Sequence, residues 1–194
     1  MEESRQTPAS LFSQCMIPQH YPVEEGKIYA GEYPGARSPE YAEARLKHLI
    51  AKGVRTFVDL TEPADDMEPY DDLLARLGEE TGFPLRRISM PVRDMGIPES
   101  AESMRAIIDA IRSSKEVAPA VYIHCWGGIG RTGTVVGCWF RECGHDAEAA
   151  LEQVQNLYSR HMEKVRYNPE SPQTREQRSY VRDWKPVNKK GGSG

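Results

Sequence analysis

The chain has 194 residues, of which 39% are hydrophobic and 28% are charged, and its formal net charge is −4. This length and composition are typical of one globular domain with its own hydrophobic core. The negative charge argues against a general nucleic-acid-binding protein, because such proteins gain most of their affinity from Lys and Arg contacts to phosphates. We therefore expect no nucleic-acid partner.

The N-terminal residues, the lengths of the apolar stretches and the cysteines indicate where in the cell the protein resides. Residues 1–4 do not begin a secretory signal, and no apolar stretch approaches the roughly 20 residues of a membrane span. The four cysteines do not form the pattern of a disulfide framework. We therefore expect a cytoplasmic protein with free thiols and no contact with membranes.

Patterns along the chain divide it into an arm, a domain and a tail. Residues 1–25 are polar and interrupted by prolines, so we expect a flexible N-terminal arm. Residues 26–186 are expected to form the single folded domain, and residues 187–194 a flexible tail. Within the domain we predict, in chain order, a strand at 28–31, a helix at 38–53, a strand at 56–60, a helix around 73–82, a strand at 85–90, a helix from 98 onward, a strand at 121–124, a helix at 131–143, a helix after 146 and a last helix at 174–184.

The alternation of strands and helices predicts an α/β fold. We expect a central, mostly parallel, twisted sheet of four to five strands, flanked by helices on both faces. Single residues support the element boundaries: Ser38 followed by Pro39 is a typical helix start, and Gly53 is a typical stop. In open sheets of this class, ligands bind beyond the carboxyl ends of the strands.

The most informative motif lies at such an end. Nine consecutive residues, His124 to Thr132 (HCWGGIGRT), follow the predicted strand at 121–124 and lead into the next predicted helix. They place the thiol of Cys125 and the guanidinium of Arg131 on one glycine-rich turn. A helix N-terminus and a nearby arginine both favour the thiolate form of a cysteine. The arrangement therefore indicates a nucleophile that attacks a bound phosphate.

The remaining residues of this turn fit a phosphate cradle. Glycines let the chain curl so that successive backbone N–H groups face one point, and an arginine binds two oxygens with its planar fork. Thr132 places a hydroxyl where it can stabilise the thiolate when the sulfur leaves, and His124 is expected to brace the turn by hydrogen bonds. The predicted substrate-binding residues are Trp126, Gly127, Gly128, Ile129, Gly130 and Arg131.

The nine residues resemble the signature of the cysteine-based protein tyrosine phosphatase superfamily, His-Cys-x5-Arg-Ser/Thr. The turn is most similar to that of the small dual-specificity-type phosphatases, in particular the kinase-associated phosphatases. The resemblance extends over residues 26–184. It implies that the domain at 26–186 is a phosphatase domain of this fold. It also implies hydrolysis in two steps through a cysteinyl-phosphate, with no metal and no other cofactor.

The resemblance further implies a general acid, an aspartate on a mobile loop upstream of the cysteine. Asp94 lies 31 residues before Cys125, in a segment similar to the family's strand–Pro–x–x–Asp–x–x–x–Pro pattern. A carboxylic acid here would protonate the leaving oxygen and then, as a carboxylate, activate the hydrolytic water. A turn-capping aspartate is the alternative. The expected catalytic residues are Cys125, Asp94, Arg131 and Thr132.

Four further residues have two interpretations each. Gln177 aligns with the place where many relatives hold a polar group near the hydrolytic water, but it could also be a glutamine on a helix surface. Trp126 lines the pocket mouth or packs under the acid loop. The apolar neighbours of Cys138 favour a core position over a redox role. Glu62 is expected to brace the arginine of the turn rather than to touch the substrate.

The turn is informative about mechanism and less so about the substrate. It holds no cation besides Arg131, which argues against a polyanionic inositol phosphate or an RNA 5′ end. We expect a phosphoprotein substrate, with phosphotyrosine and also phosphoserine or phosphothreonine, and a monomeric enzyme. Two alternatives stay open: a phosphatase of a phosphoinositide or a nucleotide or RNA 5′ phosphate, and a non-catalytic phosphoprotein-binding module.

Overall fold

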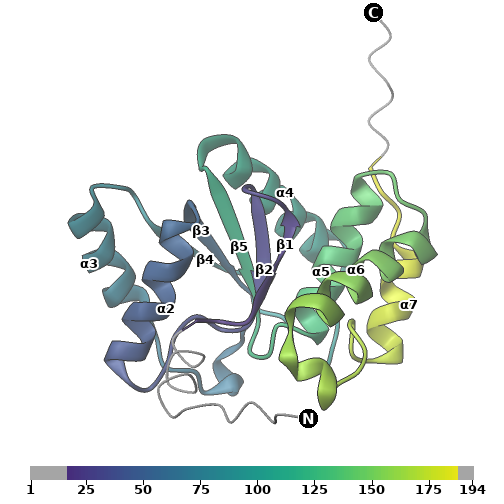
Figure 1. Cartoon of the computed structure of the whole chain (residues 1–194). Coiled ribbons are helices and arrows are strands. Elements are labelled where there is room, and N and C mark those ends of the chain that lie inside the picture. The colour runs from purple at the N-terminus through teal and green to yellow at the C-terminus, as the bar shows by residue number, and fades with distance from the viewer. Residues whose placement is uncertain (1–16, 188–194) are drawn as a thin grey trace, which may run out of the picture.

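The computed structural model describes residues 17–187 (Figure 1), so most of the expected arm and nearly all of the expected tail lie outside the described residues. The predicted strands and helices occur in the predicted order, together with a strand and two 3₁₀ turns that were not predicted. They are β1 (His20–Glu24), β2 (Ile28–Gly31), α2 (Pro39–Ala51), β3 (Val54–Asp59), the 3₁₀ turn η1 (Pro63–Asp65), α3 (Asp71–Thr81), β4 (Arg86–Ser89), α4 (Ala101–Val117), β5 (Ala120–His124), α5 (Gly130–Glu142), α6 (Ala147–His161), the 3₁₀ turn η2 (Glu163–Arg166) and α7 (Arg175–Asp183).

The five strands form one sheet in the order β1-β2-β5-β3-β4. Strand β5 is central and pairs in parallel with β2 and β3, and β4 pairs in parallel with β3. Helices cover both faces: α2 and α3 lie on one side, and α4 to α7 on the other (Figure 1). The predicted α/β fold with a mostly parallel sheet is therefore confirmed.

The flexible-arm prediction is wrong for residues 20–24. These residues form β1, which pairs antiparallel with β2 at the edge of the sheet. Its side chains alternate between half-buried and buried, and Tyr21 is completely buried. The partner strand supplies the hydrogen bonds of β1, so its formation depends on a tertiary contact that a local pattern does not reveal.

The first residues of the helices show why the helices could be predicted from local sequence. Ser38, Ser100 and Asp146 each accept a hydrogen bond from a backbone N–H in the first turn of the helix that follows, as N-cap residues do. Apolar side chains of α4 (Met104 and Ile107 among them) pack into the larger core cluster on one face of the sheet. Among residues 17–187, no helix has both the length and the apolar character that a membrane crossing requires.

Candidate active site

The turn between β5 and α5 lies at the carboxyl end of the central strand. Gly128 has φ +74°, and a Cβ there would come within 2.3 Å of the carbonyl carbon of Gly31, so only glycine fits. Helix α5 begins after Ile129 with no side-chain cap. Its first N–H groups are therefore available to an anion, as the glycine-rich pattern predicts.

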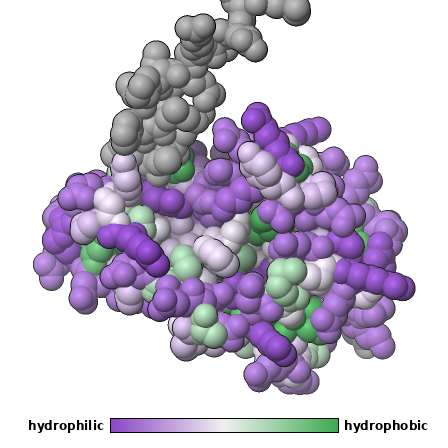
Figure 2. Space-filling view, turned by 90° about the horizontal axis from the view of Figure 1, so that it is seen from below, coloured by the Kyte–Doolittle hydropathy of each residue, from purple (hydrophilic) through white to green (hydrophobic). Residues whose placement is uncertain are grey.

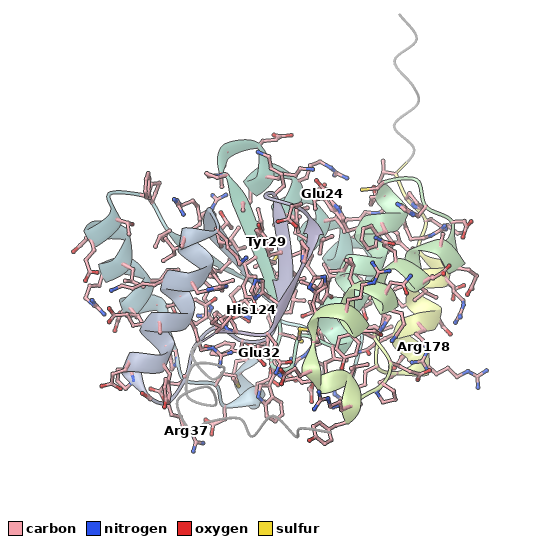
Figure 3. The ribbon with its side chains drawn as sticks, in the orientation of Figure 1. Glu24, Tyr29, Glu32, Arg37, His124 and Arg178 are labelled. Carbon is pink, nitrogen blue, oxygen red and sulfur yellow. The ribbon has the colours of Figure 1, made fainter. Side chains whose placement is uncertain are left out.

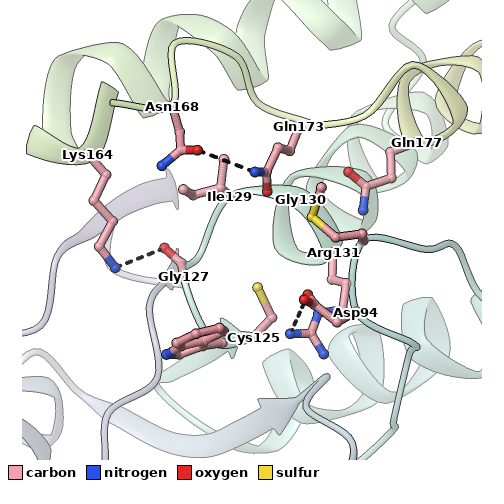
Figure 4. Close-up of a pocket in the computed structure, with 12 residues that line it drawn as sticks. Asp94, Cys125, Gly127, Ile129, Gly130, Arg131, Lys164, Asn168, Gln173 and Gln177 are labelled. Carbon is pink, nitrogen blue, oxygen red and sulfur yellow. Dashed lines mark hydrogen bonds and ion pairs between the residues drawn. The ribbon is translucent and has the colours of Figure 1, made fainter. Parts of the chain in front are cut away.

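Cys125 opens into a cavity of about 350 Å³ (Figure 4). The residue directly follows β5, every residue of which is buried, and only 3% of Cys125 is exposed. The fold thus holds the thiol at the floor of a pocket rather than on an open surface. The pocket is lined by Asp94, Met95, Cys125, Trp126, Gly127, Ile129, Gly130, Arg131, Lys164, Asn168, Gln173 and Gln177.

The guanidinium of Arg131 is buried and held by a carboxylate that the sequence did not single out. Nη1 and Nη2 donate to the two oxygens of Asp65 at 2.6 and 3.0 Å, and Nη1 also donates to the carbonyl of Val92 at 3.1 Å. The expectation that Glu62 braces this arginine is wrong. Asp65, three residues further on, does so from the 3₁₀ turn η1, which has no periodic pattern to predict it.

Asp94 lies in the same pocket as Cys125, as the resemblance to the family implies. Its Oδ1 is 3.0 Å from Nη2 of Arg131, and its side chain is 47% exposed. Its backbone N–H donates to Oε1 of Glu62 at 2.9 Å. Glu62 therefore positions the loop that carries Asp94, while the carboxylate of Asp94 reaches over the arginine of the turn.

Gln177 is a buried residue, so its interpretation as a glutamine on a helix surface is wrong. Its side chain closes the cap of α7 with Thr174, and its Nε2 donates to the carbonyl of Gly96 at 2.9 Å. It also packs so closely on Gly130 that a Cβ there would lie 2.9 Å from the amide. Gln177 thus connects the loop of Asp94 to the turn of Cys125.

His124 and Thr132 are buried on either side of the turn. Nε2 of His124 lies 2.8 Å from the Tyr70 hydroxyl, and burial lowers the pKa of His124 to about 4. The imidazole is therefore neutral at physiological pH, which suits a brace. Within the described part of the chain, the buried Thr132 hydroxyl has no hydrogen-bond partner.

The rim of the pocket also contains residues that no sequence motif indicates. Lys164 and Asn168 reach the pocket from η2 and the segment after it. Trp126 is 58% exposed and forms part of the wall, which agrees with its interpretation as a pocket-mouth residue. Figure 2 views this end of the molecule and shows a mostly hydrophilic surface with small, separate hydrophobic patches. Such a surface suits a polar ligand.

Removing the charge of Asp65 is expected to impair the site through Arg131. The substitution Asp65→Asn keeps the size of the side chain but removes the negative charge that accepts from both Nη1 and Nη2 of the buried Arg131. The guanidinium therefore loses its fixed orientation. We expect kcat/KM for an aryl phosphate to fall about a hundredfold, the usual effect of misplacing a binding group. Asp66→Asn is the matched control because Asp66 is exposed. Equal activity of the two variants would contradict the assignment of Asp65.

Cys138 lies in the core, as its neighbours predict. It is completely buried in the larger core cluster, and burial raises the pKa of its thiol. Among residues 17–187, no group of three or more His, Cys, Asp or Glu side chains is arranged to hold a metal ion.

The chain is similar to known proteins in sequence and in fold. A curated relative, an uncharacterized protein of Methanocaldococcus jannaschii, is 32% identical over 120 residues, which cover 61% of this chain and 68% of that protein. The active form of Tk-PTP is 25% identical, with a TM-score of 0.60 over 84% of this chain and 94% of that structure. Kinase-associated phosphatase, solved with its catalytic cysteine replaced by serine, is 17% identical, with a TM-score of 0.64 over 91% of this chain and 94% of that structure.

The family assignment rests on the greater part of the chain. The model of the Swiss Army Knife protein DSP-PTPase phosphatase domain matches residues 35–181. The matched range contains the turn, the loop of Asp94 and the 3₁₀ turn that holds Arg131. The chain therefore belongs to the Swiss Army Knife group of DSP-PTPase phosphatase domains, within the dual-specificity-type cysteine phosphatases.

Proposed function

We propose that this phosphatase hydrolyses phosphotyrosine, and also phosphoserine or phosphothreonine, on proteins through a cysteinyl-phosphate intermediate. The observation that carries the proposal is the convergence of Cys125, Arg131 and Asp94 on one pocket at the end of β5. These three groups supply a nucleophile, a phosphate-binding cation and a proton donor. The reaction of a phosphate monoester needs all three.

In the first step, Sγ of Cys125 attacks the phosphorus, and the bond between phosphorus and the ester oxygen breaks. The N–H groups of the turn and the guanidinium of Arg131 bind the other phosphate oxygens. Asp65 accepts one hydrogen bond from Nη1 and one from Nη2, and the carbonyl of Val92 accepts a second from Nη1. The phosphate therefore takes the side of Nη2 that now faces Asp94. Asp94 gives a proton to the leaving oxygen as the bond between phosphorus and that oxygen breaks.

In the second step, a water molecule attacks the phosphorus of the cysteinyl-phosphate. Asp94, now a carboxylate, takes a proton from the water, and the bond between sulfur and phosphorus breaks. The departing thiolate accepts a hydrogen bond from Thr132, whose buried hydroxyl has no other partner within the described residues. Gln177 holds the Asp94 loop over the turn through the carbonyl of Gly96, which keeps the acid in place for both steps.

The fold alone does not select the substrate. Solved structures of this fold include a complex of P. aeruginosa TpbA with pTyr and a complex of PTPMT1 with PI(5)P, at 21% and 15% identity and TM-scores of 0.56 and 0.60. Support for a phosphoprotein comes from the turn, which holds no cation besides Arg131, and from the half-exposed Trp126 beside Cys125. An indole there offers a face against which the ring of a phosphotyrosine can pack.

The test is turnover across a panel of substrates at equal concentration. We expect phosphotyrosine peptides to be hydrolysed with the highest kcat/KM, phosphoserine and phosphothreonine peptides with lower values, and phosphoinositides and nucleotides least. Cys125→Ser is the control for contaminating activity. Preference for a phosphoinositide or a 5′ nucleotide would contradict the protein-substrate proposal, and binding of phosphopeptides without any turnover would instead indicate a non-catalytic module.

A further inference from the structure

Lys164 places a second cation at the rim of the catalytic pocket. The residue belongs to η2, between α6 and α7, and lines the same cavity as Cys125 (Figure 4). Its ammonium donates to the carbonyl of Gly127 at 3.3 Å and forms an ion pair with Glu32. These contacts hold the ammonium in a fixed position beside the turn.

The contact with Gly127 shows which part of a substrate could reach Lys164. A phosphate bound in the turn faces its backbone N–H groups, and the carbonyls point the other way. An ammonium held on a carbonyl therefore lies outside the phosphate cradle. A group that meets Lys164 must belong to a part of the substrate next to the reacting phosphate rather than to that phosphate itself.

The ion-pair cluster of Lys164, Glu32 and Arg45 carries a net positive charge. Glu32, whose side chain is 13% exposed, pairs with Arg45 at 2.6 Å and also with Lys164. Among residues 17–187, Glu32 is the only carboxylate within ion-pair distance of the Lys164 ammonium. One negative charge is thus shared by two cations. Figure 3 shows Glu32 near the end of the sheet where the turn lies.

A polar side chain extends the same wall of the pocket. Asn168 accepts a hydrogen bond from Nε2 of Gln173 at 3.3 Å, which orients its amide. The nitrogen of that amide lies on the side where Lys164 enters the pocket (Figure 4). The amide of Asn168, a hydrogen-bond donor, and the ammonium of Lys164 therefore lie together on one wall of the pocket. The carboxylate of Asp94 lies on the opposite wall (Figure 4).

We propose that Lys164 determines specificity by binding an acidic side chain next to the phosphorylated residue of the substrate. This inference rests on the proposed phosphoprotein substrate. Since Lys164 is 31% exposed, the pairing resembles an exposed ion pair, which is modest in strength and weakened by salt. Its contribution is therefore selection among phosphopeptides rather than binding of the phosphate.

The test compares two phosphotyrosine peptides that differ only in the residues on both sides of the phosphotyrosine, Asp in one and Asn in the other. With the full chain, we expect kcat/KM to be about three- to fivefold higher for the Asp peptide, the upper part of the range that an exposed ion pair contributes. In Lys164→Met the two peptides should be hydrolysed equally, and in Lys164→Arg the preference should persist. Lys47→Met is the matched control, because Lys47 pairs with Glu43 on α2, and it should keep the preference.

Three outcomes would overturn the proposal. The first is a wild-type enzyme with no preference for the Asp peptide. The second is a Lys164→Met variant that loses activity on both peptides but keeps the ratio, since Lys164 would then only support the turn. The third is a Lys164-dependent preference for inositol bisphosphate over inositol monophosphate without any preference among peptides. Failure of the protein-substrate proposal looks different: neither peptide is hydrolysed while an aryl phosphate still is, in a reaction that needs Cys125.

Discussion

Replacing Cys125 by serine should abolish turnover while leaving the phosphate site intact. The change removes the thiolate but alters the size of the side chain little, so the N–H groups of the turn and Arg131 still bind an oxyanion. We expect kcat for an aryl phosphate to fall about 10⁶-fold, as when the covalent nucleophile of another hydrolase is removed. The measurement is steady-state turnover together with the rise in Tm caused by inorganic phosphate or tungstate.

Cys138→Ser and Cys143→Ser are the controls for Cys125→Ser. They show whether the loss of activity is specific to Cys125 or follows the removal of any thiol. Cys143 is exposed on the surface, so its substitution should leave kcat unchanged. Cys138 is buried in the core, so its substitution should lower Tm but leave a folded enzyme that turns over substrate. A Cys125→Ser variant that stabilises on phosphate addition yet keeps normal kcat would contradict the assignment of the nucleophile.

Replacing Asp94 by alanine should make activity depend on the leaving group. A phosphotyrosine or alkyl phosphate needs a proton on its departing oxygen, whereas an activated aryl phosphate leaves as a stable phenolate. We therefore expect kcat to fall about 10²- to 10⁴-fold for the poor leaving groups, the usual contribution of a general acid, and far less for the activated ester. The measurement is kcat for a series of aryl phosphates of graded phenol acidity.

The series also contains its own control. In the wild-type enzyme the rate should vary little with the phenol, because Asp94 supplies the proton, and in Asp94→Ala it should rise steeply with phenol acidity. Equal loss on all substrates would show that Asp94 only holds Arg131, with which it forms an ion pair. Since the removed carboxylate also activates water in the second step, the variant should accumulate the intermediate on activated esters.

Most of the fold could be predicted because its signals are local. Ser38, Ser100 and Asp146 cap the helices that they precede, and apolar spacing marks the buried faces. The edge strand β1 was missed because its hydrogen bonds come from β2, which a local pattern cannot show. The turn between β5 and α5 could be predicted because its signal is local. Cys125 and Arg131 lie in one short segment, and their spacing in that segment fixes their geometry.

The parts of the site that come from elsewhere in the chain were predicted less well. Asp65 and Lys164 lie in single 3₁₀ turns without periodicity. Only tertiary packing brings Asp65 to Arg131 and Lys164 to the pocket. The sequence indicates Gln177, but the burial of this residue against Gly130 depends on the packing of α7 on the turn. The sequence therefore indicates the reacting groups and the turn that faces the substrate. The residues that position these groups from elsewhere in the chain, and Lys164 at the rim, require the structure.

The central claim is that Cys125 carries the phosphoryl group during the reaction. The most direct measurement is mass spectrometry of Asp94→Ala after reaction with an activated aryl phosphate and rapid quenching in denaturant. Peptide mapping should find one phosphoryl group on Cys125, and Cys125→Ser should show none. Phosphate on another residue, such as His124, or rapid product formation with no enzyme-bound phosphate at any time, would contradict the account.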